Sequence, residues 1–326
     1  MPALATYELT KDYAVGFWRK RPYRALDHLT LEVEAGEVFG FLGPNGAGKT
    51  TTLKLLMQLV FPTSGRAELL GRPAGDLDAR RRIGYLPEHP YFYDYLTAEE
   101  LLSYYAALFG ITGQARTRRV ATLLDDVGVG AERRLQLRKF SKGMLQRVGI
   151  AQALLNEPEL VIFDEPMSGL DPLGRRDVRS LILRLRDRGC TVFFSSHVLS
   201  DAEALCSRVA ILARGRLMTA GRLTDMLAFQ IRGWEVVATG VTEAAQAALS
   251  PRATSATRVG DERYVFDLPV DPAPDRFVAD LAATGATLLS VNPLRDTLED
   301  VFVKQVTAPA ASAHDRGLGP APGGSR

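Results

Sequence analysis

The sequence predicts an α/β protein with a mostly parallel sheet, followed by a second, smaller α+β domain. Two observations support this prediction. Short apolar runs typical of buried strands alternate with helical patterns up to about residue 228, and this order is typical of a parallel sheet. Beyond that residue the order becomes β-α-β-β-α-β and then a helix, which is typical of a ferredoxin-like domain.

The first elements follow the order strand, loop, helix. Residues 4–42 read as strands and turns, and they end in a buried apolar run. A glycine-rich loop follows, and a helical pattern begins near Lys49. From residue 97 to about 155 the pattern is helical, and Thr97 with Glu100 predicts a capping box at its start.

The next elements continue the alternation of strands and helices. Residues 159–163, ELVIF, predict a short buried strand. Asp171 and Pro172 predict the N-cap and first position of a helix that ends near Gly189. Residues 191–196, TVFFSS, predict another buried strand, which adds to the parallel sheet.

The domain boundaries follow from these patterns. We expect one domain over residues 1–228 and a second over 229–306. Residues 307–326 are rich in Ala, Pro, Gly and Ser, a composition that predicts a disordered tail.

Composition excludes several classes of protein. The net charge is +2, which gives no case for a nucleic-acid partner. Two cysteines, Cys190 and Cys206, make no disulfide framework and fit a reducing compartment. The first residues lack the apolar core of a signal peptide. No stretch reaches the roughly 18–20 apolar residues of a membrane helix, so at a membrane another chain would have to span the bilayer.

The first chemical motif is GPNGAGKT, residues 43–50, between a predicted strand and a predicted helix. It satisfies the P-loop pattern, in which glycines let backbone N–H groups converge on a phosphate at a helix N-terminus. Lys49 would reach the β- and γ-phosphates of ATP, and the Thr50 hydroxyl would ligate Mg²⁺. The nucleotide-contacting residues expected here are Gly43, Pro44, Asn45, Gly46, Ala47, Gly48, Lys49, Thr50 and Thr51.

The second motif is LVIFDEP, residues 160–166, in which two carboxylates follow an apolar strand. Adjacent acids at a strand end are a weak signal alone, but they gain meaning after a P-loop. Asp164 is then expected to hold Mg²⁺, and Glu165 to polarise the water that attacks the phosphate.

With FDEPMSGLDP and FSKGMLQR added, residues 5–228 resemble the ATPase subunit of ATP-binding cassette (ABC) transporters, with the motifs in the family's order. The resemblance implies a P-loop NTPase core with a β-subdomain and a helical subdomain. FSKGM occupies the place of the family signature, usually written LSGGQ. The resemblance implies that Ser141 and the N–H of Gly143 bind the γ-phosphate of ATP held by a second subunit. The free N–H groups at the start of a helix suit this role, because they attract an anion.

The same resemblance assigns further roles. Residues 168–171, which end in Asp171, would form the loop that crosses to the opposing subunit. His197 would be the switch histidine that contacts the γ-phosphate. Tyr13 would stack on adenine. A long insertion, AVGFWRKRPYRALD, separates Tyr13 from the core, so Trp18 or Tyr23 could take this place instead.

Two departures from the family pattern point to a subfamily. Lys142 and Met144 stand where many members carry glycine and glutamine. Glu88 stands in place of the glutamine that senses Mg²⁺ and water, and its carboxylate could still ligate the metal. Both changes are similar to those in a branch of bacterial antibiotic, multidrug and sodium exporters. That branch often ends in a phrase like TLEDVFVKQ, residues 297–305.

The expected function is therefore that of a transport ATPase. The resemblance implies two copies, head to tail, that enclose two ATP molecules with Mg²⁺. A multi-spanning membrane permease would grip the groove near Glu88 and residues 97–140, and would hold the ATPase at the cytoplasmic face of the cell membrane. The alternative is a soluble ABC ATPase that acts on ribosomes or DNA. Those relatives usually carry two cassettes or a long coiled coil, whereas this chain has one P-loop and no heptad array.

Overall fold

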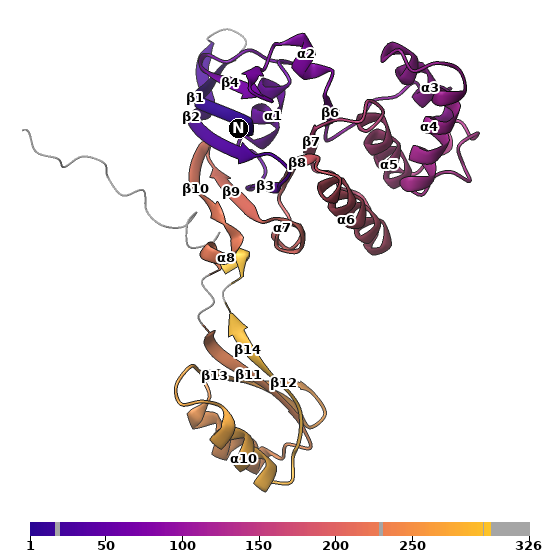
Figure 1. Ribbon diagram of the computed structural model, residues 1–326. Helices are drawn as coiled ribbons and strands as arrows, with labels where there is room; N and C mark the ends of the chain where they lie inside the picture. Colours follow the sequence, from indigo (N-terminus) through magenta and orange to yellow (C-terminus); the bar gives the residue numbers. More distant parts are fainter. Residues whose placement is uncertain (17–19, 228–230, 296, 301–326) are drawn as a thin grey trace, which may run out of the picture.

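The computed structural model describes residues 1–16, 20–227, 231–295 and 297–300 (Figure 1). Its centre is a six-stranded sheet in the order β10-β9-β3-β8-β7-β6. All neighbouring strands in this sheet run parallel, except that β10 runs antiparallel to β9. The strands are β3 (Val38–Leu42), β6 (Ile83–Leu86), β7 (Leu160–Asp164), β8 (Thr191–Ser196), β9 (Arg208–Ala213) and β10 (Arg216–Arg222).

A second, antiparallel sheet covers one side of helix α1 (Lys49–Leu56) in the order β2-β1-β4-β5. Its strands are β1 (Pro2–Val15), β2 (Arg21–Glu34), β4 (Ser64–Leu69) and β5 (Arg72–Pro73). Apolar side chains from both sheets and from α1 form one buried cluster, which includes Phe39, Phe41, Leu53 and Phe193. The short helix α2 (Leu77–Arg80) follows this sheet.

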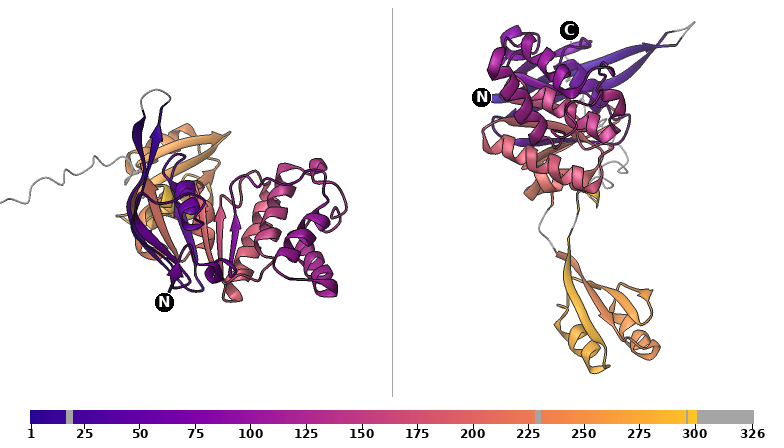
Figure 2. Two further views of the ribbon diagram at one scale, coloured as in Figure 1. Left: turned by 90° about the horizontal axis from the view of Figure 1, so that it is seen from above. Right: turned by 90° about the vertical axis from the view of Figure 1, so that its right-hand side faces the viewer.

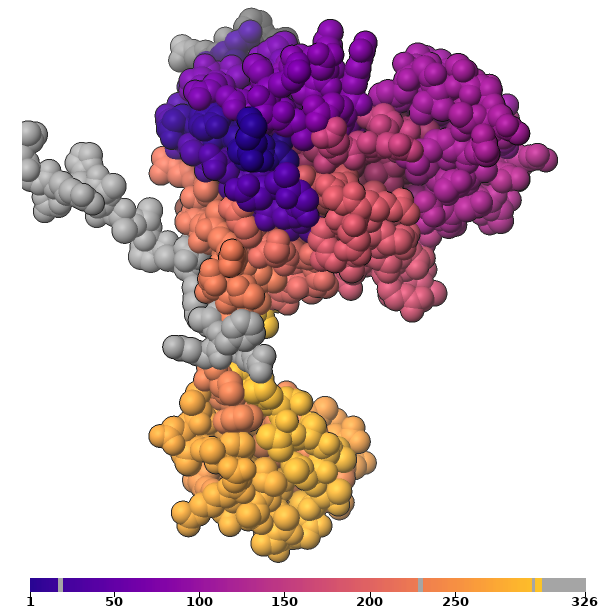
Figure 3. Space-filling view, in the orientation of Figure 1, coloured from indigo at the N-terminus to yellow at the C-terminus, as the bar shows by residue number. Residues whose placement is uncertain are grey.

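The helical residues form a lobe beside the sheets (Figure 3). This lobe contains α3 (Ala98–Leu108), α4 (Gly113–Asp126), the 3₁₀ turn η1 (Leu137–Lys139) and α5 (Lys142–Ala153). Helix α3 begins with the predicted capping box of Thr97 and Glu100. The larger of the two buried clusters in this part of the chain joins the lobe to the sheet and to α6 (Pro172–Asp187) and α7 (Leu199–Leu205).

The C-terminal body has the predicted β-α-β-β-α-β order. Its sheet has the order β12-β13-β11-β14, and helices α9 and α10 pack on it over a separate apolar cluster that contains Val236, Phe266 and Phe277. Its elements, after the short helix α8 (Leu223–Met226), are β11 (Ile231–Thr239), α9 (Glu243–Leu249), η2 (Ser250–Arg252), β12 (Ser255–Gly260), β13 (Arg263–Pro269), α10 (Asp275–Ala283) and β14 (Thr287–Arg295). Figure 2 shows this body apart from the two sheets and the helical lobe.

The chain returns to the main core after β14. Leu298 is fully buried in the same apolar cluster as α7. Its N–H donates a hydrogen bond of 2.6 Å to Glu203 Oε1 on α7, and Thr297 with Asp300 forms a reciprocal cap. The C-terminal body is thus joined to the main core at both of its ends.

Two predictions about the chain's organisation lie outside the described residues. The predicted boundary at residue 228 and the predicted tail, residues 307–326, fall in segments that the structure does not describe. Among the described residues, no helix has the length and apolar character needed to span a membrane.

The burial of Leu298 gives a stability prediction. Leu298→Ala removes a fully buried side chain, so the free energy of unfolding should fall by about 2–5 kcal/mol. Urea unfolding followed by circular dichroism measures this loss. Leu289→Ala is the control, because Leu289 is 47% exposed and its removal should change stability by at most about 0.5 kcal/mol. Equal effects of the two substitutions would show that this segment does not dock on the core.

Candidate nucleotide-binding site

The P-loop lies between the end of β3 and the start of α1, as predicted. Gly46 and Gly48 have φ angles of +78° and +106°, which a residue with a Cβ atom rarely adopts. At Gly48 space is also lacking, because an added Cβ would lie 2.5 Å from the carbonyl oxygen of Ala25 on β2. These glycines therefore shape the loop and let β2 pack directly against it.

A pocket of about 410 Å³ opens above this loop. It brings together residues that are far apart in the sequence, including Tyr13, Glu88 and Glu165. Its lining is Tyr13, Tyr23, Ala25, Pro44, Asn45, Gly46, Ala47, Gly48, Lys49, Thr50, Thr51, Glu88 and Glu165. Tyr13 and its competitor Tyr23 thus both border the pocket, whereas Trp18 lies outside the described residues. Gly43 lines a neighbouring hollow of about 240 Å³ with His197.

The Lys49 side chain is almost fully buried at the floor of the site. Its Nζ donates to the carbonyl oxygens of Gly43 and Pro44, at 2.7 and 3.3 Å. It also forms an ion pair with Glu165 Oε1 at 3.4 Å, and both side chains are less than 10% exposed. A buried cation is costly unless it is paired, so Glu165 provides the charge that balances Lys49 in this structure.

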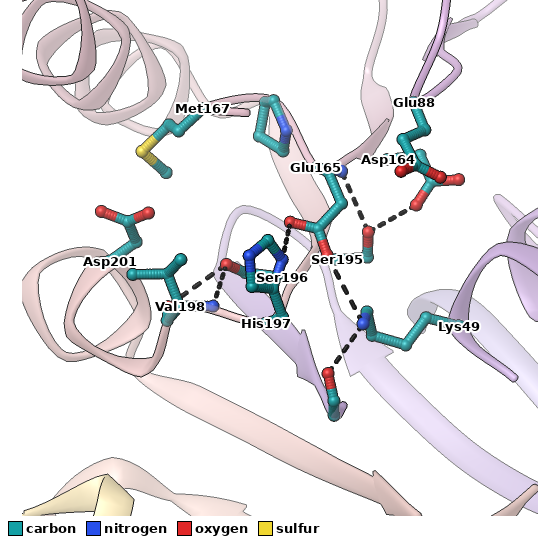
Figure 4. Close-up of polar contacts among 12 residues, drawn as sticks. Lys49, Glu88, Asp164, Glu165, Met167, Ser195, Ser196, His197, Val198 and Asp201 are labelled. Carbon is teal, nitrogen blue, oxygen red and sulfur yellow. Dashed lines mark hydrogen bonds and ion pairs between the residues drawn. The ribbon is translucent and has the colours of Figure 1, made fainter. Parts of the chain in front are cut away.

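Glu165 connects this pair to His197. Glu165 Oε2 lies 2.9 Å from Nδ1 of His197, at the end of β8 (Figure 4). Because an ionised carboxylate only accepts hydrogen bonds, Nδ1 carries the proton in this contact. Glu165 also has a φ of +51°, a conformation that costs a non-glycine residue about 1–3 kcal/mol. Its N–H donates to Ser195 Oγ at 3.0 Å, which helps to hold this strained backbone.

Asp164 is fully buried next to these groups. Its Oδ1 accepts a hydrogen bond of 2.6 Å from the Ser195 hydroxyl, and its Oδ2 has no hydrogen-bond partner among the described residues. Burial raises the pKa of Asp164, and the nearby Glu88 carboxylate adds to the rise, while the hydrogen bond from Ser195 and the neighbouring Thr50 hydroxyl oppose it. A buried carboxylate oxygen without a partner is the kind of group that a cation would satisfy.

These residues can provide some of the ligands of a Mg²⁺ ion, and a bound nucleotide would provide the others. Within the described part of the chain, no group of three His, Cys, Asp or Glu side chains gathers to hold a metal alone. Mg²⁺ is typically bound by one or two protein oxygens together with phosphate oxygens and water. Thr50 and Asp164 can provide the protein oxygens, and Figure 4 shows Glu88 beside Asp164.

Ser141, Gly143 and Asp171 lie together elsewhere. They line a second pocket of about 600 Å³ that shares no lining residue with the P-loop pocket. Ser141 is the N-cap of α5, and its Oγ accepts the N–H of Met144 at 3.2 Å. Asp171 caps α6 and accepts the N–H of Gly174 at 2.8 Å. A single chain therefore presents the P-loop and the FSKGM segment as two separate sites.

Two supporting residues were not predicted from the sequence. Ser195 lies near the end of the fully buried strand β8, and its hydroxyl joins Asp164 to the backbone of Glu165. Gln146 is buried, and its side-chain amide donates to the carbonyl oxygens of Glu165 and Pro166 at 3.3 and 3.4 Å. A polar side chain inside a buried strand or helix was the available signal in both cases.

Comparison with known proteins agrees with this geometry. Residues 26–168 match the family model described as ABC transporter. The chain is 46% identical over 303 residues to an uncharacterised ABC transporter ATP-binding protein of Synechocystis sp., covering 92% of this chain and 84% of the relative. It is 34% identical over 283 residues to the Nod factor export ATP-binding protein I of Cupriavidus metallidurans, covering 86% and 91%. It is 43% identical over 218 residues to a bacitracin transport ATP-binding protein of Bacillus licheniformis, covering 66% and 68%.

Solved structures show the same cassette. A dimeric ATP-binding cassette in a post-hydrolysis state, bound to ADP and phosphate, is 25% identical with a TM-score of 0.62, and covers 68% of this chain and 98% of that one. An ATP-binding subunit of an ABC transporter is 34% identical with a TM-score of 0.62, covering 69% and 91%. The fold and site define a P-loop ATPase. The chain belongs to the family of ABC transporter ATP-binding proteins, and it is the ATPase subunit of a transporter.

The raised pKa of Asp164 gives a prediction about stability and pH. A carboxyl group whose pKa is higher in the folded state than in the unfolded state lowers the free energy of unfolding at pH values above its folded-state pKa. This loss of stability disappears as the pH falls through that pKa. Asp164→Asn should therefore raise the free energy of unfolding at pH 7 in the absence of nucleotide, with a smaller gain at acidic pH. Urea titrations at several pH values measure this gain.

The control for Asp164→Asn is Asp261→Asn, at a fully exposed side chain that should change stability by at most about 0.5 kcal/mol. A loss of stability in Asp164→Asn at pH 7, with Asp261→Asn unchanged, would show that the buried carboxylate is well compensated without a ligand.

Proposed function

We propose that this chain powers an exporter by hydrolysing ATP in a dimer that is bound to a separate membrane permease. The observation that carries the proposal is the position of the Glu165 carboxylate, which lies between Lys49 and His197 beside the P-loop pocket. A carboxylate in this position can accept a proton from water at the γ-phosphate, which is the role of a general base.

In the proposed reaction cycle, nucleotide binding changes the partners of Lys49. Without a ligand, the Lys49 ammonium is balanced by Glu165 and by two carbonyl oxygens. A triphosphate above the loop offers Lys49 stronger anionic partners, so the Glu165 carboxylate is released from the ion pair. The proton on Nδ1 of His197 then keeps this carboxylate oriented toward the attacking water.

Mg²⁺ belongs to the proposed complex. Thr50 and Asp164 would hold it, with Glu88 as a further oxygen ligand, because Asp164 has a buried oxygen without a hydrogen-bond partner among the described residues. When bound, the ion supplies positive charge that balances the phosphate oxygens during hydrolysis. Ser195 fixes the other Asp164 oxygen, so the carboxylate has one oxygen left to offer.

A second copy of this chain would complete each catalytic pocket. The pocket with Ser141, Gly143 and Asp171 is separate from the P-loop pocket of the same chain. In a head-to-tail pair, each copy would present its α5 N-terminus to the nucleotide of the other, where a helix start stabilises phosphate. The dimeric form of the similar cassette that binds ADP and phosphate supports this arrangement.

The permease would dock on the helical lobe. A groove of about 970 Å³ lies on this lobe along α4 and the end of α3, and its lining includes Leu108, Phe109, Ile111 and Arg118. Leu108 and Phe109 are 66% and 45% exposed, which suits an apolar partner helix. This groove lies on the predicted segment 97–140, whereas Glu88 lines the nucleotide pocket instead. Isolation of the chain with ribosomes, and without a multi-spanning membrane protein, would contradict this docking.

The direction of transport is proposed from the relatives. The similar proteins include a bacitracin transport ATP-binding protein and a Nod factor export ATP-binding protein. The departures at Glu88, Lys142 and Met144 agree with this exporter branch. In an exporter the ATPase would lie at the cytoplasmic face of the membrane, held there by the permease.

Replacement of the proposed base tests the function. Glu165→Gln should keep ATP binding but lower hydrolysis by about 10²–10⁴-fold, because the amide cannot accept the proton. With ATP and Mg²⁺, light scattering after size exclusion should show a stable dimer of this variant. Glu34→Gln, at an exposed position of β2, is the control and should hydrolyse ATP normally. Hydrolysis by Glu165→Gln at the parental rate would exclude Glu165 as the base.

A further inference from the structure

We propose that Tyr23 is a second base-contacting residue, which holds the nucleotide base together with Tyr13. This inference rests on the proposed function and deepens it, because it concerns the base end of the same pocket. Tyr23 lies on β2 and borders the pocket above the P-loop.

The position of the Tyr23 side chain follows from the lining of the pocket. Tyr13, Tyr23 and Ala25 of the β1–β2 hairpin border it, together with residues 44–51 of the P-loop. A nucleotide whose phosphates lie on the P-loop would extend its base along this pocket, toward the two tyrosines.

Tyr13 and Tyr23 stand next to each other on this hairpin. They are direct partners in the antiparallel register of β1 and β2, so their Cβ atoms lie about 4.5–5.5 Å apart. The ring of Tyr13 already has the Lys11 ammonium 5.0 Å from its centroid. Tyr23 is 54% exposed, and its side chain makes no hydrogen bond, ion pair or ring contact with another described residue. Within the described part of the chain, its ring is therefore open to contact with a ligand.

The opposite face of the hairpin is fixed without either tyrosine. Arg24 pairs with Asp12 directly across the two strands at 2.9 Å, and with Asp27 at 2.9 Å. Asp27 also pairs with Arg216 on β10 at 2.7 Å. This chain of ion pairs ties the hairpin to the central sheet. These ion pairs hold the hairpin without using the Tyr23 ring, so the ring can serve a ligand in the pocket.

Two neighbouring aromatic rings suit a planar base attached to a triphosphate. Stacking of a base on an aromatic side chain contributes roughly 1–3 kcal/mol and tolerates different bases, since every base has a π-face. We therefore expect Tyr23 to contribute to the affinity for nucleoside triphosphates, and not to the affinity for a phosphate chain alone.

The experiment compares ATP with inorganic tripolyphosphate, which lacks the base and the sugar. The full chain and its variants Tyr23→Ala, Tyr23→Phe and Tyr104→Ala are titrated with each ligand and Mg²⁺ in a calorimeter. Tyr104 is the matched control, because it is 53% exposed and lies on α3, away from the pocket lining. Tyr23→Ala should weaken ATP binding about tenfold and leave tripolyphosphate binding unchanged. Tyr23→Phe should bind ATP within about twofold of the parent, because it keeps the ring.

Each other outcome has a distinct meaning. Equal losses for ATP and tripolyphosphate in Tyr23→Ala would show that the ring only supports the hairpin, and would overturn the inference. Unchanged ATP binding in Tyr23→Ala would overturn it as well, while the proposed function would stand. Failure of the parental chain to bind ATP would overturn the proposed function together with this inference.

Discussion

The buried ion pair between Lys49 and Glu165 is the interaction on which the site depends. Lys49 cannot remain charged in a nearly closed site unless an anion balances it, and in this structure that anion is the expected catalytic base. In the proposed mechanism the two groups separate when a triphosphate enters, since the phosphates would then balance Lys49. The resting site thus holds Glu165 in an ion pair, and nucleotide binding would release its carboxylate to act as the base.

The parallel sheet explains why these groups meet. The carboxyl ends of neighbouring parallel strands lie at one edge, so β3 leads into the P-loop, β7 ends in Asp164, and β8 leads to His197 at the same place. The buried hydroxyl of Ser195 then connects the two acidic positions, because it donates to Asp164 and accepts from the backbone of Glu165. The apolar strands thus provide a rigid frame, and a few polar groups at their ends provide the chemistry.

Much of this site could be predicted from the sequence, because glycines before Lys49 and acids after an apolar strand have strong local signatures. The β-α-β-β-α-β order of the C-terminal body was also predicted, because its periods and turns are local. The contacts between distant segments were not. The sequence does not show that Glu165 pairs with Lys49, that Leu298 returns to α7, or that Tyr13 and Tyr23 share a register, since each depends on how separate elements pack.

In the proposed dimer, each catalytic pocket combines the P-loop of one chain with the Ser141 segment of the other. Lys49→Ala and Ser141→Ala should each be inactive alone, and mixing these two variants, each with a different affinity tag, tests whether the pockets are shared. In a mixed dimer one pocket combines both defects, and the other combines an intact P-loop with an intact Ser141. Mixing should restore roughly a quarter of the parental ATPase activity, since half of the dimers are mixed and each has one intact pocket. A mixture that stays inactive, although pull-down through one tag recovers the other chain, would show that the two chains do not share their pockets.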